Sequence, residues 1–406
     1  MPGIRVALFC MPEFGHLQRL LPVISSLREA GAEPHVFSDR HFRGAIRASG
    51  GVFHDLFRQR PLAAADSRSR PIPCRYVSFA GHFAESVITD VTALAPQLII
   101  NDAFAVIARP VAECLRLPRI NICPGHNMPP ETAIAELQSD PRVQLDDACL
   151  RAVALLRDHY GLADASPFSY MGGPSTQLNL ISEPQEFLTP AEQAAFEPCA
   201  FFGSLAEPQP TRAESAQTVD PFPVAGEGAL KIYASLGTVV WRYYADTAWS
   251  LLQALSQAAK ERRDLAVLIG LGGQLRERAP ARIAGPRVRV EAYVDQRQVL
   301  AHTGVFLTHQ GLNSTHEAIF HGVPMLSYPF FSDQPGLARR CREFGLAEPL
   351  AEAVRETVTA GDIHAALERM KLKRDLFNER LAEARNWELA AMAGRPAVIE
   401  RILDFA

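Results

Sequence analysis

The sequence predicts an α/β protein of two domains, each with a doubly wound parallel sheet, from three observations. The chain has 406 residues, whereas single cores stop growing at roughly 250–300. Short apolar runs alternate with helical patterns, and this alternation starts twice, at Ile4 and again at Lys231. Between the two series, residues 206–229 are rich in proline and glycine with almost no apolar pattern, which is typical of a linker.

The first series begins with the continuous apolar run Ile4–Cys10, which has the length of a buried parallel strand. Apolar residues then recur at helical spacing until Gly31, which ends the helix. Further strands are expected at 35–38, 52–56, 98–102 and 119–123, and helices at 42–48, 77–95 and 105–115. Residues 58–75 and about 124–175 lack regular patterns, and we expect these long segments to shape a recognition cleft.

The second series begins with a strand at Lys231 that runs into Ser235-Leu236-Gly237-Thr238. Further strands are expected at 265–269, 288–291, 305–308 and 325–328, and late helices at 363–370, 372–384 and 397–403. Residues 270–275 lack the last glycine of a Gly-x-Gly-x-x-Gly fingerprint, which disfavours a dinucleotide oxidoreductase.

Bulk composition excludes several classes of protein. Hydrophobic residues make up 48% and charged residues 21%, as in an ordinary globular protein. A net charge of −4 does not indicate binding to nucleic acid or to an anionic membrane. No apolar run approaches the ~18 residues of a membrane span, and Val6–Met11 is too short for a signal peptide, so we expect a cytoplasmic protein without stable membrane insertion.

The histidine and cysteine patterns predict neither a disulfide framework nor a metal site. The seven cysteines are scattered, odd in number and without Cys-x-x-Cys, which indicates free thiols. Histidine clusters with ligand spacing and an Asp-x-Asp motif are both missing from the sequence. We therefore expect a metal-independent protein.

The segment Thr308–Glu317 joins an expected strand to a helical pattern. A polar, glycine-containing turn at a helix N-terminus suits an anion, because the first-turn N–H groups are unpaired and the helix dipole favours negative charge. His309 and Ser314 can add donors, and Glu317 lies one turn past Ser314, where its carboxylate can accept from a diol. Ser314-x-x-Glu317 also fits a capping box that serves only the backbone, and these residues alone leave both interpretations open.

The pattern continues after the next strand, where Asp333 and Gln334 follow at the carboxyl end, the edge at which open α/β sheets bind ligands. In sequence order, the motif is His309-x-Gly311-x-Asn313-Ser314-x-x-Glu317-Ala318, then Gly322-Val323-Pro324, then Asp333-Gln334-Pro335. It resembles the donor signature of inverting GT-B glycosyltransferases. It is most similar to the plant and bacterial UDP-glycosyltransferases that modify small lipophilic molecules, in particular the bacterial natural-product or macrolide-type branch.

This resemblance implies two Rossmann-like doubly wound parallel-sheet domains facing a cleft, the GT-B fold. The N-terminal domain, 1–205, would bind the acceptor, and 206–229 would be the linker. The C-terminal domain, 230–385, would bind the nucleotide sugar, and the helix at 386–406 would pack back on the N-terminal domain.

The resemblance also implies the catalytic residues. Gly15-His16 falls on the family's base, and Asp102 falls on the carboxylate that activates it. An imidazole with a pKa near ~6.5 suits a base, and a carboxylate on its other nitrogen would orient the ring. From the residues alone, either could simply end a helix or strand. Leu17-Gln18-Arg19 depart from the family's Asn-Pro, which affects the local acceptor contacts; we predict Phe14 and His126 as acceptor-binding residues.

The resemblance places the nucleotide on twelve residues: Ser235, Gly237, Thr238, Tyr293, Val294, Gln296, His309, Gly311, Leu312, Asn313, Ser314 and Glu317. Tyr293-Val294-Asp295-Gln296 resembles a Trp-x-Pro-Gln segment that stacks on the base, although Asp295 replaces the proline and Tyr293 could instead be a core aromatic. Glu317 favours a ribose, hence UDP, and Asp333 with Gln334 would hold hexose hydroxyls.

We therefore predict an inverting hexosyltransferase that moves sugar from a UDP-glucose-like donor to a hydroxyl of a small lipophilic acceptor. It would need no cofactor besides the UDP-sugar co-substrate, bind no nucleic acid, and act as a monomer or homodimer. Three alternatives stay open: a dTDP-deoxysugar transferase acting at O, N or C, a nucleotide-sugar epimerase or hydrolase on the same fold, and a non-catalytic partner.

Overall fold

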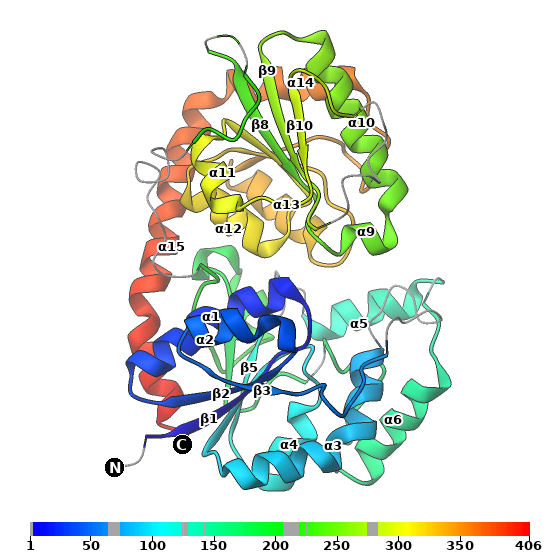
Figure 1. Ribbon diagram of the computed structural model, residues 1–406, viewed down its shortest axis with the longest axis vertical. Helices are drawn as coiled ribbons and strands as arrows, with labels where there is room; N and C mark the ends of the chain where they lie inside the picture. Colours follow the sequence, from blue (N-terminus) through cyan, green and yellow to red (C-terminus); the bar gives the residue numbers. More distant parts are fainter. Residues whose placement is uncertain are drawn as a thin grey trace. The chain divides into compact units, whose positions relative to one another are not determined.

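The computed structural model describes residues 3–63, 74–123, 125, 129–141, 143–171, 173–205, 219–224, 226, 228–273 and 283–406. The chain divides into two compact units. Unit 1 comprises Met1–Glu207 with Ala390–Ala406, and unit 2 comprises Pro208–Leu389. Each unit contains one parallel sheet with helices on both faces, so the predicted fold class is confirmed (Figure 1).

The elements of unit 1 are, in chain order, β1 Arg5–Phe9, α1 Phe14–Glu29, β2 Glu33–Ser38, the 3-10 turn η1 Arg40–Phe42, α2 Arg43–Ala48, β3 Val52–Asp55, α3 Arg75–Leu94, β4 Leu98–Asp102, α4 Ala108–Leu115, β5 Arg119–Ile122, α5 Pro130–Ser139, α6 Asp147–Asp158, β6 Leu178–Ile181, the 3-10 turn η2 Gln185–Phe187, α7 Pro190–Ala194 and β7 Cys199–Phe201.

Unit 2 contains β8 Leu230–Ser235, α9 Val240–Tyr243, α10 Ala245–Glu261, β9 Leu265–Gly270, β10 Val288–Glu291, α11 Gln296–His302, β11 Val305–Thr308, α12 Leu312–Phe320, β12 Met325–Ser327, α13 Gln334–Glu343, β13 Ala347–Pro349 and α14 Ala360–Leu372. The last helix, α15, runs over Arg374–Leu403, and its residues from Ala390 onward belong to unit 1.

The sheet of unit 1 has the order β3-β2-β1-β4-β5-β6-β7, and all its pairings are parallel. Side chains of a strand alternate between faces, so β1 feeds two cores. Ala7 and Phe9 pack in the core with α3, α4 and α6. Val6 and Leu8 pack in the core with α1, α2 and the end of α15. Helices cover both faces of this sheet (Figure 1), and burial on both faces explains why β1 is an unbroken apolar run.

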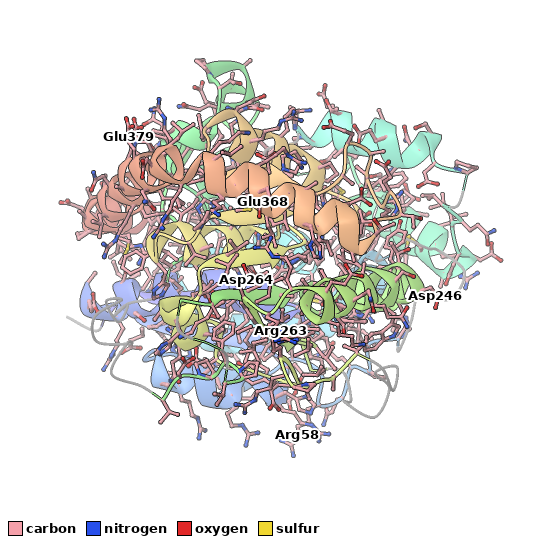
Figure 2. All side chains as sticks on the ribbon, turned by 90° about the horizontal axis from the view of Figure 1, so that it is seen from above. Arg58, Asp246, Arg263, Asp264, Glu368 and Glu379 are labelled. Atoms are coloured by element: carbon pink, nitrogen blue, oxygen red, sulfur yellow. The ribbon has the colours of Figure 1, made fainter. Side chains whose placement is uncertain are left out.

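The sheet of unit 2 has the order β10-β9-β8-β11-β12-β13, again fully parallel. Helices α10 and α14 lie against each other beside this sheet (Figure 1). Arg262, just after α10, donates to Asp264 and to Glu368 of α14, the latter at 2.9 Å; Figure 2 labels both carboxylates. Exposed pairs of this kind add at most about 1 kcal/mol, so buried apolar packing holds the helices.

Both sheets change winding direction at an internal strand pair. In unit 1 the chain builds outward from β1 to β3, then returns to β4 on the other side of β1. In unit 2 it builds from β8 to β10 and returns to β11. The loops after such a pair leave the sheet in opposite directions, so a crevice opens at the carboxyl ends of the two strands. Functional side chains are therefore expected after β1 and β4, and after β8 and β11.

Several local expectations were wrong. The segment 124–175, expected to be irregular, contains α5 and α6; Asp146 caps α6 and accepts from the Ala148 and Cys149 N–H groups. The two helices expected at 372–384 and 397–403 are one continuous helix, α15, which contains Pro396. Strands β6, β7 and β13 were not predicted.

Two further points concern the chain as a whole. In the predicted linker, residues 206–218, 225 and 227 lie outside the described residues. No helix within the described ranges is long and apolar enough to cross a membrane.

Candidate functional site

His16 and Asp102 meet at the winding reversal of unit 1. Strands β1 and β4 are neighbours, with Phe9 opposite Asn101, so the residues that follow them emerge at the same edge. His16 is the third residue of α1, and Asp102 is the last of β4. His16 Nδ1 lies 2.5 Å from Asp102 Oδ1, and the two side chains are only 13% and 3% exposed. The structure thus joins two residues 86 positions apart.

The imidazole of His16 is also held from its face. The Phe104 ring packs against it with the ring centroids 4.0 Å apart. Asp102 Oδ2 is buried and has no hydrogen-bond partner among the described residues. The hydrogen bond that the structure shows for this carboxylate is therefore the one between Oδ1 and His16. With Nδ1–H donated to Asp102, a neutral ring carries its lone pair on Nε2, the arrangement that a general base requires.

Of the two predicted acceptor residues, Phe14 lies within the described part of the chain. Phe14 opens α1 two residues before His16, and its side chain is exposed. His126 lies outside the described residues. The sequence missed Glu13, which is buried and accepts from Tyr76 Oη at 2.6 Å and from Arg75 Nη2 at 3.0 Å. No spacing rule links residue 13 to residues 75–76, so only the fold could bring them together.

In unit 2, helix α12 begins before Ser314, whereas the capping-box interpretation requires Ser314 to be its N-cap. Gly311 is the N-cap residue, and Leu312 is the first residue of the helix. Ser314 therefore lies inside the first turn. The side chains of Ser314 and Glu317 both accept from Gln296 Nε2, at 3.1 and 2.6 Å. The capping-box alternative is therefore wrong. The side chains of Ser314 and Glu317 instead belong to a polar cluster with Gln296 at the N-terminus of α12.

His309 lies between two glycines. A Cβ on Gly237 would stand 2.6 Å from His309 Nε2, and one on Gly311 would stand 2.3 Å from it. Gly237 also has φ +70°, a conformation that side chains disfavour. Burial lowers the pKa of His309 to about 4, although a backbone hydrogen bond at Ser235 raises it. Near pH 7 the imidazole is therefore neutral and can donate one hydrogen bond to an anion.

Gln296 connects the residues around the predicted ribose position. Its Oε1 accepts from Tyr233 Oη at 3.4 Å, while its Nε2 donates to Ser314 and Glu317. Burial raises the pKa of Glu317, and the hydrogen bond from Gln296 opposes that rise. The sequence did not identify Tyr233 as part of this group, since a tyrosine in a buried strand gives no functional signal.

The segment before α11 does not carry a buried aromatic ring, as the end of a core strand would. Tyr293 is 69% exposed, so the core-aromatic alternative is wrong and its ring face is available for stacking. Asp295 is the N-cap of α11, and its carboxylate accepts from Arg297 N at 3.2 Å. This cap fixes the turn that proline would have stiffened. Val294, between them, is half-buried.

The remaining predicted residues lie at strand ends, loops and helix starts of unit 2. Ser235 ends β8, and Thr238 is exposed just beyond Gly237. Asn313 is the second residue of α12 and half-buried. Gln334 begins α13, and its Oε1 accepts from the N–H groups of Phe330 and Phe331 at 2.9 and 3.3 Å.

Asp333 is the residue just before α13. Strands β8 and β11 are adjacent, and β8, α12 and the loops after the two strands carry nine of the twelve predicted nucleotide residues. Within the described part of the chain, no group of three or more His, Cys, Asp or Glu side chains could hold a metal ion.

Comparison with known proteins shows what the chain as a whole is similar to. The family model described as "UDP-glucoronosyl and UDP-glucosyl transferase" matches residues 200–381. An uncharacterized UDP-glucosyltransferase of Bacillus subtilis (strain 168), YdhE, is 25% identical over 358 residues, which cover 83% of each chain.

Two solved structures share the fold over nearly their whole length. The glycotransferase of kitacinnamycin aligns with a TM-score of 0.77 and 21% identity, over 99% of this chain and 100% of that one. A UDP-glucose: anthocyanidin 3-O-glucosyltransferase in complex with UDP aligns with a TM-score of 0.71 and 17% identity over all of both chains. The predicted resemblance to UDP-glycosyltransferases of the GT-B fold is confirmed, and the matches support an enzyme of the glycosyltransferase class.

Proposed function

We propose that this glycosyltransferase moves a hexose from a UDP-sugar to a hydroxyl group of a small lipophilic acceptor of natural-product type, with inversion at the anomeric carbon. The observation that carries the proposal is the buried His16–Asp102 pair at the winding reversal of its sheet. A histidine oriented by a carboxylate through Nδ1 leaves Nε2 to take a proton.

The reaction is a direct displacement. His16 Nε2 takes the proton of the acceptor hydroxyl, whose oxygen forms a bond to the anomeric carbon. The bond from that carbon to the diphosphate oxygen breaks, and the electron pair leaves with the nucleoside diphosphate. Asp102 holds the ring and stabilises the imidazolium that forms. Because the nucleophile enters opposite the leaving group, the anomeric configuration inverts.

The leaving diphosphate gains negative charge, which the α12 N-terminus is suited to accept. The N–H groups of its first turn and the helix dipole favour an anion, and neutral His309 adds one donor. Gln334 and Asp333, at the start of α13, are proposed to bind the sugar hydroxyls. No cofactor besides the donor is part of this scheme.

Two features support UDP over a deoxyribose donor. Glu317 is a carboxylate acceptor beside Gln296, a pair suited to a vicinal diol such as that of ribose. The anthocyanidin glucosyltransferase that shares the fold was solved with UDP bound. A dTDP donor lacks the ribose 2′-hydroxyl and would leave part of the acceptor capacity of Glu317 unused.

The test is a mass-spectrometric transfer assay with UDP- and dTDP-sugars against a panel of phenolic and polyketide aglycones. We expect a mass gain of one hexose with a UDP-sugar and at least one acceptor, and its loss in His16→Ala with nucleotide affinity retained. Donor turnover in the absence of any acceptor would identify a hydrolase or epimerase instead. Equal loss of nucleotide affinity in His16→Ala would assign His16 to donor binding and refute the proposal.

A further inference from the structure

The reverse face of α12 carries a buried polar contact that the proposed reaction does not use. His316 Nδ1 lies 2.5 Å from Glu388 Oε1 of α15, and the two side chains are 0% and 1% exposed. Both residues belong to unit 2. A charged or polar pair removed from water to this extent is costly unless its geometry is well satisfied. A leucine pair would fill such a position without that cost, so the contact calls for a specific explanation.

A second contact joins the same two helices one turn away. The Arg385 guanidinium lies 4.9 Å from the centroid of the Phe320 ring. His316 and Phe320 are four residues apart on α12, and Glu388 and Arg385 are three apart on α15, so each pair shares one face of its helix. The earlier residue of α12 meets the later residue of α15, which means that the helices pack antiparallel. Two points of contact fix both the sliding and the rotation of α12 against α15.

The orientation of α12 matters because its other face carries the proposed nucleotide contacts. At about 3.6 residues a turn, His316 points about 130° away from the midpoint of Ser314 and Glu317. A rotation or slide of the helix on its back face would therefore move Ser314 and Glu317 relative to Gln296, which bonds to both. It would also move the N–H groups of the first turn.

We propose that the His316–Glu388 pair, together with Phe320–Arg385, is a positioning device that sets the register of α12 for nucleotide binding. This inference rests on the proposed function, because it assumes that α12 holds the donor diphosphate. His316 and Glu388 are positioning residues: they touch neither donor nor acceptor and act through Ser314, Glu317 and the helix N-terminus.

The test replaces the pair by apolar side chains and measures nucleotide affinity. Exchange of a buried pair for hydrophobic residues is often neutral or stabilising, so the double variant His316→Leu/Glu388→Leu is expected to fold. A misplacement of about 1 Å can cost ~10²-fold, and α12 remains tethered to β11, so we expect UDP affinity to fall about three- to tenfold. The KM for the donor should rise by the same factor, with kcat at saturating donor changed less than twofold.

A matched control breaks another ion pair of unit 2. Arg369 Nε of α14 donates to Glu348 of β13 at 2.6 Å, and Arg369→Met should leave UDP affinity unchanged. If the double variant fails to fold, Phe320→Leu provides the same test, because it removes the Arg385 contact and keeps the buried pair. We expect a two- to fourfold loss of affinity from it.

Melting temperatures separate positioning from stability. A double variant that melts like the wild type but binds UDP with wild-type affinity overturns the inference, as does a folded Phe320→Leu variant with unchanged affinity. If the wild-type protein itself binds no UDP in calorimetry, the proposed function fails rather than this inference, so the two failures can be distinguished.

Discussion

The substitution Asp102→Asn tests the proposed base most directly. It keeps the shape of the side chain and removes the charge that faces His16 Nδ1 across 2.5 Å. An amide can also present its N–H₂ group to Nδ1, which would move the ring proton to Nε2, the atom that must accept the acceptor's proton. The perturbation therefore acts on the charge and on the tautomer together.

The expected loss follows from the burial of the pair. Hydrogen bonds to charged groups contribute about 1.5–3 kcal/mol, which is about 10- to 150-fold in rate. The carboxylate is only 3% exposed, so solvent screening reduces this little. The wrong tautomer adds to the loss, and the same substitution in a hydrolytic triad costs about 10⁴-fold. We expect kcat to fall by about 10² to 10⁴, with nucleotide affinity within about twofold of wild type.

The chain offers a matched control for this variant. His41 Nδ1 and Asp39 Oδ1 are also 2.5 Å apart in unit 1, but the His41 side chain is 76% exposed. Asp39→Asn should leave kcat within about twofold of wild type. Initial rates at saturating donor and acceptor measure both variants, and calorimetry measures UDP binding. If Asp102→Asn retained wild-type kcat, or lost rate no more than Asp39→Asn, the assignment of the base would be refuted.

Three further predictions concern the nucleotide residues and stability. Gly237→Ala places a Cβ 2.6 Å from His309 Nε2 at a backbone with φ +70°, and we expect a loss of about 1–3 kcal/mol of stability with weaker UDP binding, measured by thermal melting and calorimetry. Because burial raises the pKa of Glu317, UDP affinity should fall as pH drops through that raised pKa, and the fall should begin at a higher pH than for an ordinary glutamate; a calorimetric titration from pH 7 downward measures it. Glu317→Gln should bind weakly at every pH. His35 Nδ1 and His54 Nε2 are 2.9 Å apart, and burial lowers the pKa of both histidines. Below about pH 6.5 the unfolded chain therefore binds more protons than the folded one, so stability should fall with decreasing pH. His54→Phe should flatten the profile of melting temperature against pH.

Each of these has a control or a contrary outcome. Gly273→Ala, at φ +88° with no atom within 4 Å of the added Cβ, should destabilise through strain alone and spare UDP binding. Wild-type affinity in Gly237→Ala would show that the His309 imidazole is not constrained as described. A pH-independent UDP affinity in the wild type would remove Glu317 from the ribose position. An unchanged pH profile in His54→Phe would show that Glu33, near His35, compensates for the charge.

The sequence predicted those features that depend on local pattern. The apolar runs at Ile4 and Lys231 located the first strand of each sheet, and the order of turns after 305–308 located the start of α12, the proposed anion site. The residues 16 and 102 could be paired only through the family resemblance, because nothing in their local sequence states that β1 and β4 are adjacent. The structure supplies the physical reason, which is the reversal of winding between those strands.

What the sequence could not predict depends on contacts between distant residues. Of the two glycines around His309, only Gly311 belongs to the sequence motif. A glycine is required at position 237 because the His309 imidazole, more than 70 positions later in the chain, occupies the space that a side chain would need. Gln296 was assigned to the nucleotide, but its bonds to Ser314 and Glu317 required the spacing of α11 and α12. The continuity of α15 was missed because a proline such as Pro396 normally ends a helix. In the structure the neighbouring Arg395 is buried and donates to the carbonyls of Phe202 and Leu205, a long-range contact that the sequence does not reveal.

The membership of α15 in both units has a practical consequence for protein engineering. A chimera that exchanges unit 1 by a single crossover in 206–229 would separate residues 390–406 from the core to which they belong, where Ile399 and Ile402 pack with Val6 and Leu8. A hybrid enzyme should therefore be assembled with two crossovers, the second near Leu389, so that each transplanted half brings its own terminal segment. Libraries built with one junction would lose folded members for this reason before substrate preference was ever tested.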